Sequence, residues 1–68
     1  MFHANKLRGK IAESGINISE LSKLIGIDKS TFYRKMDDAE GSFTVKEVYC
    51  IADVLELSAE DVHNIFFS

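Results

Sequence analysis

A six-residue pattern that is typical of helix starts occurs four times in this chain. Each copy has an apolar residue, a capping residue, two variable positions, an acidic or hydroxyl residue and a second apolar residue. The copies are Ile16–Leu21, Ile27–Phe32, Phe43–Val48 and Leu57–Val62. The capping side chain can accept a hydrogen bond from a first-turn backbone N–H, and the two apolar residues can pack together. The pattern predicts helices that begin after Asn17, Asp28, Thr44 and Ser58.

The first two helix starts are close enough together to form one motif. Asn17 and Asp28 leave room only for a short helix and a turn between them. Gly26 stands just after that helix, where the backbone needs a positive φ that glycine adopts at no steric cost. Two short helices joined by a glycine turn are the pattern of a helix-turn-helix.

Hydrophobic periodicity predicts an all-α fold of five helices, and residues 1–68 are expected to form a single domain. The expected helices are Ala4–Ser14, Ile18–Ile25, Lys29–Met36, Val45–Leu55 and Ala59–Phe66, with Gly15 ending the first and a loop over residues 37–42. The side chains expected in the core are Ala4, Leu7, Ile11, Leu21, Leu24, Ile25, Phe32, Met36, Val48, Ile51, Ala52, Leu55, Val62 and either Ile65 or Phe66.

Charge is distributed unevenly along the chain. The net charge of −3 alone argues against a polyanionic partner. Residues 1–36, however, carry seven bases and three acids, whereas residues 37–68 carry one base and eight acids. A molecule polarised in this way can turn one face to phosphates and keep the other away from them. The alternative is an accidental asymmetry of a solvated surface.

The chain has few residues that suit a metal site or catalysis. His3, His63 and Cys50 lack the spacing of metal ligands, and there is no glycine-rich phosphate loop. We therefore expect no cofactor, no metal and no enzymatic activity, with Cys50 as a partly buried apolar residue. A single cysteine, the lack of a signal peptide and the short apolar segment Val48–Leu55 favour a cytoplasmic protein without a membrane anchor.

The segment Leu21–Phe32 resembles the helix-turn-helix of the phage Cro and repressor family, with its leucine, small serine, turn glycine and second apolar anchor. Phe43–Ala52 resembles that family's fourth helix, and the ending Ile65-Phe66-Phe67 is similar to small Cro-like proteins of phages that infect Gram-positive bacteria. The resemblance covers nearly the whole chain. It implies a five-helix, lambda-repressor-like DNA-binding domain of phage or prophage origin.

The chain departs from the family pattern at two places. The family usually opens the second helix with a polar residue that binds a DNA phosphate, often glutamine, whereas this chain has Ile18 there and Ser19 next. The family also tends to have an apolar residue where this chain has Lys35, and the apolar side chain follows at Met36. The first departure implies that this phosphate contact is either missing or moved to Ser19, and the second implies a third helix that is rotated or pitched differently.

A recognition helix reads base edges in the major groove with residues near its N-terminus, while the preceding helix crosses the backbone. With Phe32 facing inward, Lys29, Ser30, Tyr33 and Arg34 face outward, and all four can contact bases or phosphates. Further predicted DNA contacts come from hydroxyl and basic groups around them. These are Thr31, Ser19, Lys10 and Lys35, with Lys10 chosen from three bases of the first helix, Lys6, Arg8 and Lys10.

These features predict a Cro-like transcriptional regulator that binds a specific double-stranded DNA operator and represses by occupying it. A homodimer on DNA is expected, because Phe66 and Phe67 point about 100° apart on a helix and cannot both enter one small core. Two alternatives remain open. The chain is the DNA-binding half of a repressor or antitoxin, or its fold serves as a protein-interaction module that uses the acidic half.

Overall fold

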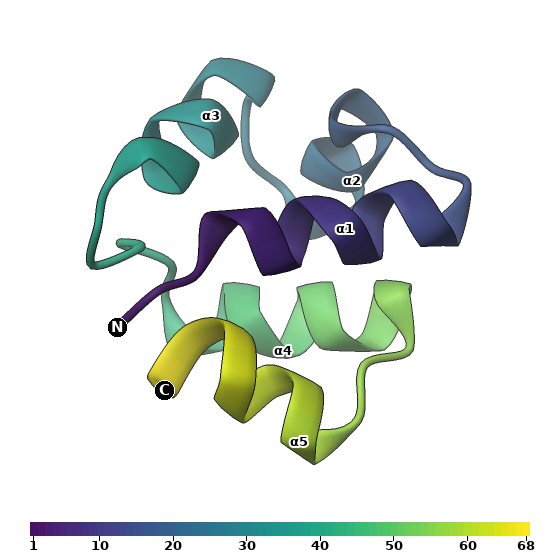
Figure 1. Cartoon of the computed structure of the whole chain (residues 1–68). Coiled ribbons are helices and arrows are strands. Elements are labelled where there is room, and N and C mark those ends of the chain that lie inside the picture. The colour runs from purple at the N-terminus through teal and green to yellow at the C-terminus, as the bar shows by residue number, and fades with distance from the viewer.

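Five α-helices and a short π-helical turn follow one another along the chain (Figure 1). They are α1 (Ala4–Ser14), α2 (Ile18–Ile25), α3 (Lys29–Asp37), α4 (Val45–Leu55), α5 (Ala59–Val62) and the π-helical η1 (His63–Phe67). The computed structural model describes all of residues 1–68. The predicted all-α fold is confirmed, and so are the bounds of α1, α2 and α4. The last helix differs, because its hydrogen bonding changes from α to π at His63.

Three of the four predicted caps form. The Asn17 side chain accepts from the N–H of Glu20 at 2.8 Å, and Thr44 and Ser58 accept from first-turn N–H groups at 3.1 and 3.0 Å. The expectation for Asp28 is wrong. Its backbone has the extended conformation of a cap, but its side chain accepts no hydrogen bond from α3 and stays exposed, where water can solvate the carboxylate.

The turn between α2 and α3 has the geometry predicted for it. Gly26 has φ 81°, and its N–H donates to the carbonyl of Lys23 at 3.2 Å. The N–H of Ile27 donates to the carbonyl of Ser22 at 3.0 Å. These two bonds satisfy carbonyls at the end of α2 and set the direction in which α3 begins.

The core joins all the helices except α5. Its buried apolar residues are Phe2, Leu7, Ile11, Leu21, Phe32, Met36, Val48, Ile51, Ile65 and Phe66. Phe43 is only partly buried but lies at the centre of an aromatic cluster, with its ring centroid 5.6 Å from Phe2, 5.3 Å from Phe32 and 6.0 Å from Phe66. Phe2 was not among the expected core residues. Both Ile65 and Phe66 are buried, where one of the two was expected.

The expected core is corrected most clearly in α2. Leu24 is 61% exposed, and the small Ser22 is buried in the core-facing surface of the helix. The hydroxyl of Ser22 donates to the carbonyl of Ile18 at 2.7 Å, so burial leaves it with a partner. The remaining expected core residues are only partly buried; Ala4, Ile25, Leu55 and Val62 pack at the margin of the core, and Ala52 is of intermediate exposure.

In the view of Figure 1, α1 crosses the middle of the molecule, with α2 and α3 in the upper part and α4 and α5 in the lower part. Both chain ends lie at the same side. None of the helices has the length and hydrophobicity that a bilayer span requires.

Candidate nucleic-acid interface

The outer face of α3 carries the four side chains that the sequence predicts to contact bases. Lys29, Ser30, Tyr33 and Arg34 are all exposed. Phe32 and Met36, one turn apart, are buried and hold α3 against the core. Ser30 and Arg34 lie on the face of α3 opposite these anchors, and Lys29 and Tyr33 lie on the flank that borders the groove toward α1.

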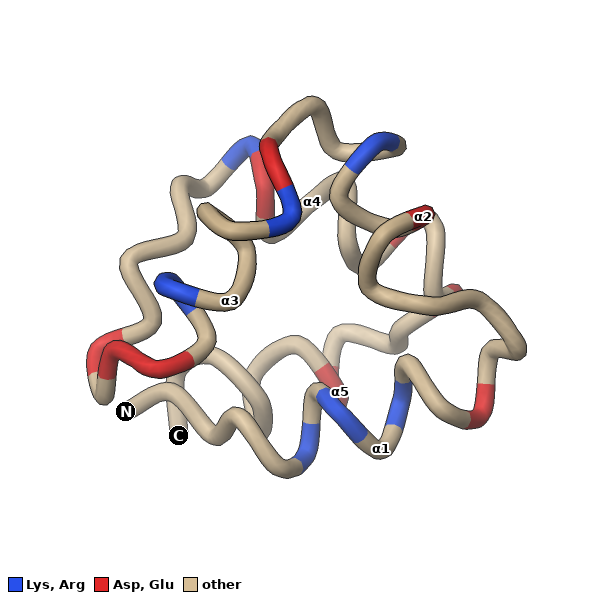
Figure 2. Tube along the Cα trace, turned by 90° about the horizontal axis from the view of Figure 1, so that it is seen from above, with Lys and Arg blue, Asp and Glu red and all other residues tan.

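Of the seven Lys and Arg residues in the N-terminal half, three lie on α1, three on α3 and one, Lys23, on α2. Figure 2 shows Lys and Arg positions along α1 and α3, with acidic positions in the loop after α3. Only two ion pairs form in the molecule, Lys10 with Asp61 and Lys35 with Glu47. Lys29 and Arg34 therefore have no carboxylate partner and are free to bind an anion.

Lys35 is held inside the fold. Its ammonium nitrogen lies 2.6 Å from Oε1 of Glu47, both side chains are only 13% exposed, and the nitrogen stands 5.8 Å from the centroid of the Phe43 ring. The same carboxylate oxygen accepts from the N–H of Thr44 at 2.9 Å. Burial raises the pKa of Glu47, but the hydrogen bonds from Lys35 and Thr44 outweigh burial and leave this pKa below its ordinary value. The pair fastens the end of α3 to the start of α4.

Lys10 lies on the side of α1 that faces α5. Its ammonium nitrogen is 3.6 Å from Oδ2 of Asp61. The Ser58 backbone N–H holds the pKa of Asp61 below its ordinary value, and the positive charge of Lys10 adds to this effect. The structure thus brings neither Lys10 nor Lys35 together with the four residues on α3.

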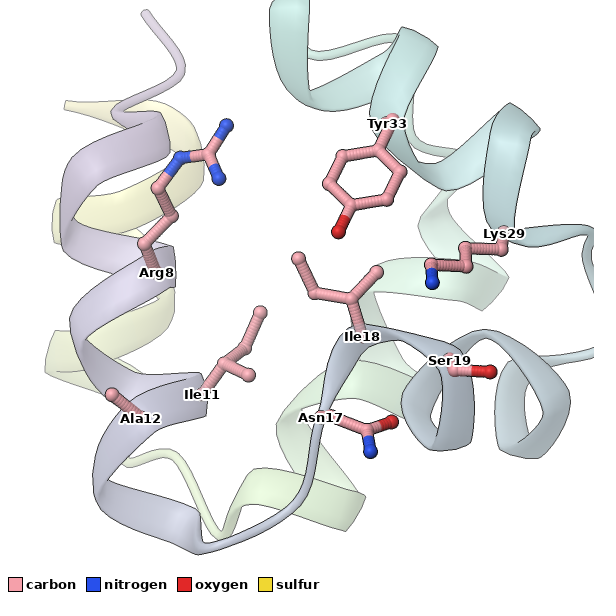
Figure 3. Close-up of a pocket in the computed structure, with 8 residues that line it drawn as sticks. All are labelled: Arg8, Ile11, Ala12, Asn17, Ile18, Ser19, Lys29 and Tyr33. Atoms are coloured by element: carbon pink, nitrogen blue, oxygen red, sulfur yellow. The ribbon is translucent and has the colours of Figure 1, made fainter.

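A groove of about 460 Å³ separates α1 from α3 and runs past the start of α2 (Figure 3). Its walls are formed by Arg8, Ile11, Ala12, Asn17, Ile18, Ser19, Lys29 and Tyr33. Arg8 extends from α1 toward Tyr33 of α3, the Tyr33 hydroxyl points down toward Ile18, and the Lys29 ammonium points into the same space. The half-buried Ser19 lies at the edge and points away.

Arg8 was not among the predicted DNA contacts. The sequence alone does not distinguish Lys6, Arg8 and Lys10. Which of these three residues lies on the flank of α1 that faces α3 depends on how the helices pack. Thr31, one of the predicted DNA contacts, is half-buried, and its side chain forms no hydrogen bond with the cap of α3.

The fold agrees with the comparison to protein families. A family model described as Cro/C1-type HTH DNA-binding domain matches residues 6–66. Neither a curated protein nor a solved structure matches the chain significantly.

Proposed function

Because this chain belongs to the Cro/C1-type helix-turn-helix family of DNA-binding domains, we propose that it binds one operator sequence in double-stranded DNA. It represses transcription by occupying that site, in the cytoplasm and on phage or prophage DNA. The observation that carries the proposal is the outer face of α3. Two basic side chains without ion-pair partners, Lys29 and Arg34, are exposed there beside Ser30 and Tyr33.

In this proposal α3 lies in the major groove of the operator. The Arg34 guanidinium donates two parallel hydrogen bonds to O6 and N7 of a guanine, Ser30 bonds either base type, and the Tyr33 ring packs on a thymine methyl group. Ser19 and Thr31 bind backbone phosphates at the edges of the groove. Lys35 contributes to DNA binding indirectly, because its ion pair with Glu47 sets the angle of α3.

The test begins with selection of the preferred sequence from random duplexes, followed by salt titrations on that operator and on random DNA. Arg34→Ala should cost about 1–3 kcal/mol on the operator and less on random DNA, where no base is read. Lys10→Ala is the comparison. If Lys10 contacts phosphate, Lys10→Ala should weaken binding to both DNAs alike and flatten the slope of log K against log[salt] by about one unit. If Asp61 holds the Lys10 side chain, the substitution should not change the slope.

Salt dependence also separates this proposal from the protein-interaction alternative. A DNA-binding protein loses affinity for random duplexes steeply as salt rises. Absence of measurable binding to any duplex at low salt, with the helical circular dichroism spectrum intact, would favour the interaction module.

We further propose that the chain binds DNA as a homodimer through an apolar surface of α4 and η1. Val45 and Phe67 are exposed and border the same shallow hollow, and the exposed Tyr49 lies one turn after Val45 on α4. Lys46 and Asp53 are exposed on either side of Tyr49 along that helix. Two copies of α4 packed antiparallel around Tyr49 would place each Lys46 opposite the partner's Asp53, so the surface is complementary to itself.

A symmetric dimer would place its two recognition helices about 34 Å apart on a pseudo-palindromic operator. Sedimentation of the protein with an operator duplex should give two chains per duplex, and Tyr49→Glu should reduce this number to one at the same concentration. Leu24→Glu is the matched control, because Leu24 is also a largely exposed apolar residue, on another helix. A one-to-one complex of the unchanged protein on a non-palindromic site would contradict the dimer.

A further inference from the structure

We propose that Arg8 and Lys29 together clamp one backbone phosphate of the DNA in the groove between α1 and α3. The inference rests on the proposed function and adds to it a contact from α1. It also assigns Lys29 to the backbone, whereas its position near the start of α3 would allow either a base or a phosphate.

The electrostatic character of this groove distinguishes it from the other hollows of the molecule. Its walls contain Arg8 and Lys29 and no acidic residue. The hollow between α1 and α4 contains Glu13, Glu56 and Asp61, and the one between α1 and η1 contains Glu13 and Asp61. The small hollow below Phe67 contains Glu40. Only the groove between α1 and α3 therefore combines bases with the absence of carboxylates.

Both bases are available to a ligand. Neither Arg8 nor Lys29 forms an ion pair, and both are exposed. Lys29 and the Arg8 side chain extend from opposite walls (Figure 3), with the Tyr33 hydroxyl between them as a third donor. A guanidinium offers parallel N–H donors that match two phosphate oxygens, and an ammonium offers a compact positive charge.

The apolar part of the groove lies between the two bases. Ile11 and Ile18 line it there and have no side-chain donor. A phosphate over these two residues would be bound by the basic groups on either side. This apolar part suits the carbon face of a deoxyribose and displaces water from the anion, which strengthens its attraction to both bases.

The position of the groove favours the DNA backbone over a free anion. Lys29 and Tyr33 belong both to this groove and to the outer face of α3. When α3 lies in the major groove, the strand that borders the major groove runs alongside α3 and therefore past Arg8. The ligand chemistry is that of a phosphodiester within a duplex.

The test compares Arg8→Ala with Lys6→Ala in salt titrations on the operator and on random DNA. Both residues are exposed bases of α1, but Lys6 borders the hollow that contains Asp61 and not the groove. Arg8→Ala should weaken binding to both DNAs about tenfold, because one charge-assisted hydrogen-bonded contact is lost. It should also lower the slope of log K against log[salt] by about one unit. Arg8→Lys should keep the salt slope, Lys29→Ala should behave as Arg8→Ala does, and Lys6→Ala should leave both affinities unchanged.

A second experiment locates the phosphate. Operator duplexes carrying a single neutral methylphosphonate are tested at each backbone position. At one position per half-site the substitution should weaken binding of the unchanged protein but not of Arg8→Ala. If no position shows this coupling, the clamp is wrong.

The outcomes separate the clamp from the proposed function. If Arg8→Ala matches Lys6→Ala while Arg34→Ala still loses operator binding, the clamp is overturned and DNA recognition stands. If no variant changes affinity and no duplex binds with salt dependence, both are overturned. If inorganic phosphate or deoxyadenosine monophosphate stabilises the protein against heat through Arg8 while Arg8→Ala binds DNA normally, the groove belongs to a free anion and the clamp is overturned.

Discussion

At the scale of single residues, Glu47 has two structural roles. It caps the start of α4 by accepting from Thr44, and it binds the Lys35 ammonium at the end of α3. Lys35 and Glu47 lie on different helices, so sequence periodicity could not reveal the pair. The resemblance to the family showed only that a basic residue stands where an apolar one is usual, and the structure shows that the Phe43 ring and Glu47 accommodate it.

The pH dependence of stability should report this ion pair. The pKa of Glu47 in the folded chain lies below its ordinary value of 4.5, so its contribution is present above that pH and is lost as pH falls through the folded pKa. Glu47→Gln should lower the unfolding free energy by about 1–3 kcal/mol at pH 7, and the loss should shrink as pH falls through the lowered pKa of Glu47, because protonation of the carboxyl removes the charge that the variant lacks. Urea unfolding followed by circular dichroism at pH 7 and at a pH below that pKa measures this.

The exposed Glu13 provides the control for that experiment, because Glu13→Gln changes the same charge without touching the pair. It should have little effect at either pH. An equal loss of stability for Glu47→Gln at both pH values would show that the ionised carboxylate contributes nothing, and would contradict the prediction.

At the scale of the helices, the helix ends that are set by local hydrogen bonding and backbone conformation could be predicted from the sequence. Gly15, Gly26, Thr44 and Ser58 act on backbone groups within one turn, so their sequence pattern is sufficient. Asp28 has the same pattern, but its side chain forms no cap hydrogen bond, and its exposure, which the capping Asn17 shares, does not explain this. The π-helical turn at the end of the chain could not be predicted from local sequence either, since it brings both Ile65 and Phe66 into the core, which involves packing against distant segments.

Two glycines should respond in opposite directions to the same substitution. A Cβ at either Gly9 or Gly26 would meet no atom within 4 Å, so only backbone conformation matters. Gly26→Ala forces a left-handed backbone on alanine and should cost about 1–2 kcal/mol. Gly9→Ala lies inside α1 and should stabilise by about 0.5–1 kcal/mol. Thermal unfolding by calorimetry measures both, and a shift of the same sign for the two variants would be inconsistent with the φ of 81° at Gly26.

The two leucines of α2 test the corrected core. Periodicity predicts that both are buried, but it cannot locate the centre of the buried stripe in so short a helix. Leu21 is fully buried and Leu24 is 61% exposed. Leu21→Ala should cost about 2–5 kcal/mol, since it leaves a cavity. Leu24→Ala should change stability by less than about 0.5 kcal/mol, as expected at a surface site. Urea midpoints that fall equally would restore the prediction made from the sequence.

At the scale of the whole molecule, the candidate site and the core depend on packing between distant segments. The outward residues of α3 were predictable because one buried anchor, Phe32, fixes the helix face. Arg8 was not, since the flank of α1 that meets α3 is decided by the arrangement of all the helices. Phe2 was missed for the same reason. It precedes α1 and belongs to no periodic pattern, yet its ring lies 5.6 Å from both Phe43 and Phe66.

Phe2 and Phe67, near opposite ends of the chain, should therefore have different effects when removed. Phe2 is buried, its neighbour His3 donates its backbone N–H to Ile65 at 2.8 Å, and a Cβ at Gly41 would stand only 2.9 Å from its ring. Phe2→Ala should cost about 3–5 kcal/mol, a large part of the total stability of a small domain. Phe67→Ala, at a 61% exposed site, should leave the dilute monomer within about 1 kcal/mol of the unchanged protein.

Thermal melts over a range of protein concentrations distinguish the two roles. If Phe67 belongs to the proposed dimer surface, the Tm of the unchanged protein should rise with concentration, because association stabilises the folded state by mass action. Phe67→Ala should remove that dependence, whereas Phe2→Ala should lower Tm at every concentration. The Tm of the unchanged protein without operator could prove independent of concentration while two chains still bind each operator duplex. That result would restrict dimer formation to the DNA. A Tm of Phe2→Ala equal to that of the unchanged protein would contradict the role of Phe2 in joining the two ends of the chain.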